Sequence, residues 1–166
     1  MTLVDPLGER APLPPSVQEA LVTAEAWEKL PGERKMVASL LRWLMNVGWL
    51  GSASHAAFEV PWRGRRIDLV TTNSKGRLST FEFKLGGTGR VFEQALYNSI
   101  SANRSLIVSG GRPTSSYQAM AEAHGLGVIV VNGKVDLIQR PVLRKPDPVL
   151  LRSLRDRALS RSGQHV

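Results

Sequence analysis

Two acids and a lysine near the middle of the chain have the types and spacing that metal-assisted phosphate chemistry needs. Asp68 stands in Arg-Arg-Ile-Asp-Leu-Val, and Glu82 and Lys84 follow in Phe-Glu-Phe-Lys. Successive side chains of a strand point to opposite faces, so Glu82 and Lys84 share one face. The flanking Phe81 and Phe83 take the other face and can be buried while the acid and the amine line a cleft. This pattern favours a site that holds a divalent cation beside a phosphate.

The composition restricts the class of protein. The chain has 166 residues, 42% of them hydrophobic, which suits one domain with a proper core. Its net charge is +8, and residues 34–166 carry all of the positive excess. A domain this basic usually meets a polyanion, with nucleic acid the leading partner and an acidic membrane surface the weaker one.

The absence of cysteine excludes disulfides, thiolate metal sites and cysteine nucleophiles, and it fits a cytoplasmic protein. No apolar run approaches the roughly 20 residues that span a bilayer, so we expect no membrane partner.

Hydrophobic periodicity and turn residues divide the chain into helices and strands. Helices are expected over residues 16–30, 33–47, 90–102, 114–124 and 149–161, and strands over residues 57–62, 66–71, 78–85, 105–109, 127–131 and 134–139. The resulting order contains an αβββαβ core and predicts the α/β class, with a mixed sheet flanked by helices.

Three regions are expected along the chain. Residues 1–15 hold four prolines and predict an extended arm. Residues 16–140 would form the folded domain. Residues 141–166 would form a linker followed by a basic amphipathic helix, which either packs on the domain or a second subunit or lies along a phosphate backbone.

The order of these pieces resembles the PD-(D/E)XK nuclease superfamily, also called restriction-endonuclease-like, over about residues 33–109. Asp68 lies in Arg-Ile-Asp-Leu-Val, and Glu82-Phe83-Lys84 follows 14 residues later as Glu-x-Lys. The segment Gly-Glu-Arg-Lys-Met-Val-Ala-Ser-Leu-Leu is similar to the opening helix of archaeal-type Holliday junction resolvases, in which a helix acid joins the site. That acid would be Glu33.

The chain departs from the superfamily pattern at two places. Ile67 precedes Asp68 where many members have proline. Gln94 and Tyr97 are three residues apart, whereas the RecB-like branch has its Gln and Tyr four apart. We therefore do not assign the chain to that branch.

The resemblance implies a metal-dependent deoxyribonuclease. Asp68, Glu82 and the carbonyl oxygen of Phe83 would hold Mg²⁺ or Mn²⁺, and Lys84 would orient the attacking water or stabilise the developing charge. The chain offers no separate specificity domain, which favours structure-selective or sequence-tolerant cutting in repair, recombination or defence. Many relatives are dimers, so a homodimer or a partner protein is also an expectation.

Each candidate residue could instead have a purely structural role. An acid such as Glu33 favours the first turn of any helix through the helix dipole. Glu59 competes with Glu33 as the fourth member of the site, or it is a solvated acid on an edge strand. Asp68 could pair with a neighbouring arginine, and Glu82 with Lys84 could form a cross-strand ion pair.

A further set of residues is predicted to contact nucleic acid. The set consists of Trp62, Arg63, Arg65, Arg66, Arg90 and Gln94. Trp62 is included because its indole could stack on an unpaired base beside three arginines. DNA is the expected ligand, with RNA left open. The competing interpretation is a non-catalytic nucleic-acid-binding or assembly subunit built on the same fold.

Overall fold

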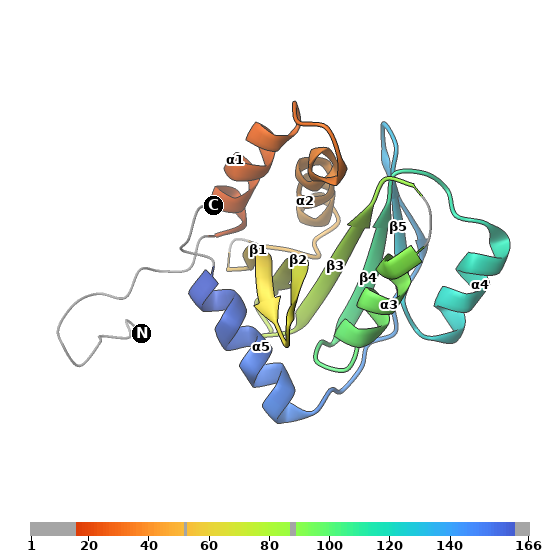
Figure 1. The fold of residues 1–166 in the computed structure, drawn as a ribbon. Coiled ribbons are helices and arrows are strands. Elements are labelled where there is room, and N and C mark those ends of the chain that lie inside the picture. Colours follow the sequence, from red (N-terminus) through yellow and green to blue (C-terminus); the bar gives the residue numbers. More distant parts are fainter. Residues whose placement is uncertain (1–15, 52, 87–88, 162–166) are drawn as a thin grey trace, which may run out of the picture.

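The computed structural model describes residues 16–51, 53–86 and 89–161 and shows a central sheet with helices on both faces (Figure 1). Its helical elements are α1 (Val17–Trp27), the 3₁₀ helix η1 (Glu33–Met36), α2 (Val37–Asn46), α3 (Gly89–Asn98), α4 (Ser115–Ala123) and α5 (Pro148–Arg161). Its strands are β1 (His55–Trp62), β2 (Arg65–Thr72), β3 (Leu78–Lys84), β4 (Arg104–Ser109), β5 (Gly127–Val131) and β6 (Val135–Gln139). The predicted α/β class and the αβββαβ core are confirmed.

The six strands lie in the sheet in the order of the chain, from β1 to β6. The first three are an antiparallel meander, β3 to β5 are parallel, and β6 returns antiparallel at the edge. The β1–β2 turn has Arg63 at φ 47° and Gly64 at φ 80°, the conformation of a tight hairpin turn that twists with its strands.

The two faces of the sheet carry different helices. On one face, α1 and α2 pack on Leu69, Phe81, Phe83 and Leu106. On the other face, α3 and α4 cover Ile107 and Val128, while α5 covers the β1–β2 hairpin. The alternation predicted for β3 is confirmed, because Phe81 and Phe83 enter the first core while Glu82 faces α3.

Strand alternation breaks at one point in the β1–β2 hairpin. Phe58 pairs with Leu69 and Val60 with Ile67, which leaves Glu59 and Asp68 opposite each other outside the ladder. Phe58 and Leu69 belong to the α1–α2 core, whereas Val60 and Ile67 belong to the α5 core. Glu59 has φ 51°, which lies in the left-handed region. This conformation is energetically unfavourable for a residue that has a Cβ atom. Side chains on the two sides of Glu59 and Asp68 along the hairpin therefore enter different cores.

Several boundaries differ from the sequence-based expectation. The helix expected over residues 33–47 begins as the 3₁₀ turn η1. α3 ends at Asn98 rather than at residue 102, because the next residues form short-range turns such as Ser101 N–H to Asn98 O at 3.0 Å.

The tail helix α5 packs on β1, the first of the two arrangements expected for it. The arm expected over residues 1–15 lies outside the described residues. Within the described part of the chain, no helix is both long and apolar enough to cross a membrane.

Candidate active site

Asp68 lies where β2 and β3 separate. The pairing of the two strands ends at Leu69 and Phe81, and Asp68 is the residue of β2 next to that last pair. Beyond that point the backbone N–H of Phe83 donates to Asp68 Oδ2 at 2.9 Å. The side chain thus accepts from a backbone N–H that a continuing ladder would have used, and it bridges the two strands.

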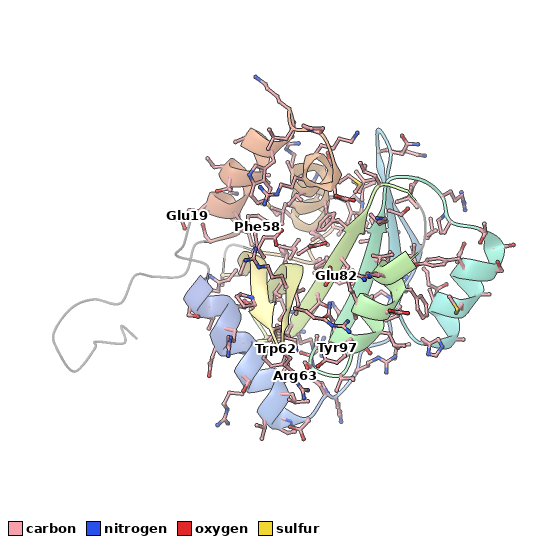
Figure 2. The ribbon with its side chains drawn as sticks, in the orientation of Figure 1. Glu19, Phe58, Trp62, Arg63, Glu82 and Tyr97 are labelled. Atoms are coloured by element: carbon pink, nitrogen blue, oxygen red, sulfur yellow. The ribbon has the colours of Figure 1, made fainter. Side chains whose placement is uncertain are left out.

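Glu82 is buried on the α3 side of β3, with 2% of its surface exposed (Figure 2). Asn98, at the end of α3, donates from Nδ2 to Glu82 Oε1 at 2.8 Å. No ion pair involves Glu82 or Asp68 in residues 16–51, 53–86 and 89–161. Neither an ion pair between Glu82 and Lys84 nor a cross-strand ion pair of either residue is present in the described structure.

The two carboxyl groups interact strongly. Burial and the charge of Asp68 raise the pKa of Glu82 to about 9. Burial also raises the pKa of Asp68, partly offset by the hydrogen bond from Phe83, while the charge of Glu33 raises it further. Two acids in a low-dielectric setting cannot both ionise cheaply, so without a cation Glu82 is protonated at neutral pH.

A cavity of about 120 Å³ opens beside Asp68 on the α1–α2 side of the sheet. Glu33, from the first residue of η1, and Glu59, from β1, line it together with Asp68. Trp27 and Phe58 contribute apolar walls. The structure therefore brings both proposed fourth acids to Asp68.

The two acids differ in their partners. Glu59 Oε1 lies 4.0 Å from Arg34 Nη2, whose guanidinium also lies over the Trp27 ring at 4.9 Å. Glu33 has no ion pair in the described part of the chain, and its charge acts on Asp68. Glu33 is consequently the acid more available to the site.

Lys84 is half-buried and lines a different cavity, of about 260 Å³, on the α3–α4 side. Its neighbours there include Val91 and Tyr117. Neither Lys84 nor Glu82 lines the cavity of Asp68. Of the two residues expected to line a cleft, Lys84 lines the cavity on the α3–α4 side, whereas Glu82 is buried beneath α3.

Asp68 and Glu82 can supply two of the oxygen ligands that a hard divalent cation needs. Asp68 Oδ2 and Glu82 Oε1 each accept one hydrogen bond, and Mg²⁺ is commonly bound through one or two carboxylates and several waters. Across residues 16–51, 53–86 and 89–161, no three acidic, histidine or cysteine residues are already arranged around a common metal position. The pair fits an ion that keeps most of its water.

The predicted nucleic-acid contacts gather mainly at the hairpin tip. Arg63, Arg65 and Arg66 are exposed. The guanidinium carbons of Arg63 and Arg65 lie 5.9 and 4.6 Å from the ring centroid of Tyr97 on α3. Figure 2 shows Arg63 and Tyr97 close together below Glu82.

Trp62 is buried and is not placed to stack on a base, contrary to the sequence-based prediction. It is 4% exposed and belongs to the core beneath α5 with Leu154 and Ala158, so its ring has no free face for a base. Its indole Nε1 is buried without a hydrogen-bond partner.

Helix α3 supplies the remaining predictions and one residue that was missed. Arg90 is exposed and Gln94 is half-buried, and no contact with the acids is seen for either in the described structure. Asn98, the partner of Glu82, was not predicted. It lies four residues after Gln94, on the same helical face, which was the available signal.

Comparisons with known proteins support the fold. No protein-family model and no curated protein sequence matches the chain. A solved protein of unknown function from Silicibacter pomeroyi has a TM-score of 0.59 and 16% identity, covering 81% of this chain and 88% of that one. At this identity the likeness shows a shared fold alone.

Two further solved structures match with TM-scores below 0.5. A repair endonuclease from Pyrococcus abyssi has a TM-score of 0.45 and 18% identity, over 63% of this chain and 49% of that one. SfsA from Pyrococcus furiosus, in complex with Ca²⁺, has a TM-score of 0.36 and 14% identity, over 76% of this chain and 65% of that one.

Proposed function

We propose that this chain is a metal-dependent nuclease that hydrolyses phosphodiester bonds of DNA. The observation that carries the proposal is the pair Asp68 and Glu82, two interacting carboxyl groups placed at a break in the sheet, neither of which forms an ion pair among the described residues. Burying such a pair costs free energy, and a divalent cation would remove that cost.

Mg²⁺ or Mn²⁺ would be held by Asp68 and Glu82, with the Phe83 carbonyl as the further ligand that the resemblance implies. Such an ion lowers the pKa of a bound water and polarises a phosphoryl oxygen. Glu33, which lines the cavity of Asp68, would bind one of the ion's waters. The Phe83 N–H and Asn98 fix the orientations of the two carboxylates.

Lys84 would act on the phosphate rather than on the ion. Its ammonium group stands two residues beyond Glu82 on the same face of β3 and is not paired with an acid in the described structure. From there it would donate to a phosphate oxygen or hold the attacking water. The exposed Arg63, Arg65 and Arg66 would hold the backbone of the substrate.

Cutting would be selective for DNA structure or tolerant of sequence, and would serve repair, recombination or defence in the cytoplasm. A homodimer or a partner protein would supply a second cut or additional recognition.

Two observations favour a second candidate, a non-catalytic nucleic-acid-binding or assembly subunit. Glu82 is covered by α3, and no metal position with three ligand side chains is preformed in the described residues. A binding subunit would hold DNA equally with and without Mg²⁺.

A cleavage assay separates the two candidates. Wild type is incubated with Mg²⁺, Mn²⁺ or EDTA and end-labelled single-stranded, duplex, flap and four-way junction DNA, with one RNA substrate. A nuclease cuts at least one DNA only with the ion, loses cutting in Glu82→Ala, and keeps it in Glu93→Ala, a matched change at an exposed acid of α3. Wild type that binds these substrates and cuts none would overturn the nuclease proposal.

A further inference from the structure

A third cavity, at the opposite end of β3 from Lys84, has three basic side chains and no acid in its lining. It has a volume of about 360 Å³ and lies between the end of α2, the β2–β3 loop and the start of β4. Its basic side chains are Lys75, Arg77 and Arg104. None of the three has an ion-pair partner in residues 16–51, 53–86 and 89–161. We call this site the basic pocket.

Arg104 is held in place by an aromatic ring. Its guanidinium carbon lies 4.7 Å from the ring centroid of Trp49, which also lines the basic pocket. Trp49 is fixed in turn by Phe81, at 6.5 Å between centroids. A guanidinium stacked on an aromatic ring uses its flat face for that contact. Its N–H groups point outward in the plane of the guanidinium, where two of them can donate to one anion.

The loop that carries the other two cations is rigidly braced. Asn73 Oδ1 accepts hydrogen bonds from the backbone N–H groups of Lys75 and Arg77, at 3.0 and 2.9 Å. From α5, Arg155 donates to the carbonyl oxygen of Gly76 at 2.6 Å. Gly76 has φ 74°, a conformation that side chains rarely allow. The loop is therefore prepared before any ligand arrives.

The basic pocket carries positive charge that no acid in its lining neutralises. Partial burial and the charge of Arg77 lower the pKa of Arg104, which shows that the two guanidinium groups repel each other. Both residues are half-buried rather than free to turn into solvent. Like charges held together in this way are stabilised when an anion lies between them.

We propose that the basic pocket binds a phosphate group of a nucleic-acid strand. Arginine forks match phosphate oxygens, and the net charge of +8 favours a long polyanion over a small one. The proposal does not require that the chain cleave DNA.

Binding of a fluorescent 15-nucleotide DNA, measured in EDTA at several salt concentrations, tests this proposal without any cleavage. Arg77→Gln and Arg104→Gln are each expected to weaken binding several-fold and to flatten the plot of log affinity against log salt by about 0.7, the loss of one phosphate contact. Arg140→Gln, the same change at an exposed arginine outside the pocket, gives the reference for net charge alone.

The outcomes are distinct. Pocket variants that bind like Arg140→Gln overturn the proposal. Titration with inorganic phosphate and with a mononucleotide identifies the alternative ligand: binding of either as tight as the 15-nucleotide strand also overturns it. Thermal unfolding confirms that each variant is folded, and if Arg104→Gln is not, Lys75→Gln at an exposed position provides the same test.

Discussion

Asn98 Nδ2 donates a hydrogen bond to Glu82 Oε1 at 2.8 Å, and the two side chains are only 3% and 2% exposed. This contact joins the end of α3 to the middle of β3 and fixes one oxygen of the buried acid. The other oxygen remains for Asp68 or for a cation. The position of Glu82 therefore depends on a neutral amide rather than on an ion pair.

Replacing Asn98 with alanine is expected to destabilise the fold by about 1–3 kcal/mol, because Glu82 is left buried without its donor. Urea unfolding in EDTA measures the change. Asn98→Asp should cost more, since it places a third carboxyl group beside two that already repel. The same Asn98→Ala change in a Glu82→Ala background, which has no acceptor left, should cost less, and a cost equal to that in wild type would contradict a direct link between the two residues.

The stability of the metal-free protein should depend on pH through Glu82. Its pKa is about 9 in the folded chain and close to 4.5 when unfolded, because burial and the charge of Asp68 oppose ionisation. The folded state binds the extra proton, so this contribution is complete below about pH 4.5 and is lost as the pH rises toward 9. The slope reaches at most about 1.4 kcal/mol per pH unit.

Glu82→Gln removes this titration while keeping an acceptor for Asn98. In EDTA the variant should be more stable than wild type at pH 8, and the difference should shrink toward pH 5. Urea unfolding at both pH values checks the sign. A difference that grows toward acid would show that Glu82 is ionised in the folded protein.

Lys84→Gln is expected to lower the rate of DNA cleavage about 100-fold or more, since a donor to the developing charge is lost. Binding of DNA should change much less, because one cation among 22 basic residues is removed. Lys134→Gln, at the exposed β5–β6 turn, is the matched control. Equal cleavage by both variants would remove Lys84 from the site.

The sequence predicts the fold well because its signals are local. Ser16 caps α1, and its hydroxyl accepts from Glu19 N–H while the Glu19 carboxylate accepts from Ser16 N–H, as the pattern Ser-Val-Gln-Glu requires. The apolar run of β5 begins and ends within the expected range. Alternation in β3 correctly separates Phe81 from Glu82.

The sequence predicts the site less completely because its geometry depends on contacts between distant segments. The change of face in the hairpin at Glu59 and Asp68 depends on the left-handed conformation of Glu59. Glutamate rarely takes this conformation, and the position has no glycine or asparagine that would have predicted it. Burial of Trp62 depends on α5, which lies about 90 residues later in the chain. The partnership of Asn98 with Glu82 requires knowing where α3 crosses the sheet.

Titration of Mn²⁺ into the protein at pH 7, followed by calorimetry, tests the central claim most directly. The claim is that Asp68 and Glu82 together hold a divalent cation. Wild type should bind Mn²⁺ with release of a proton from the carboxyl pair. Asp68→Asn should weaken that binding at least tenfold, while Asp136→Asn, at an exposed acid of β6, should leave it unchanged. Equal binding by wild type and Asp68→Asn, with no proton release, would contradict the account.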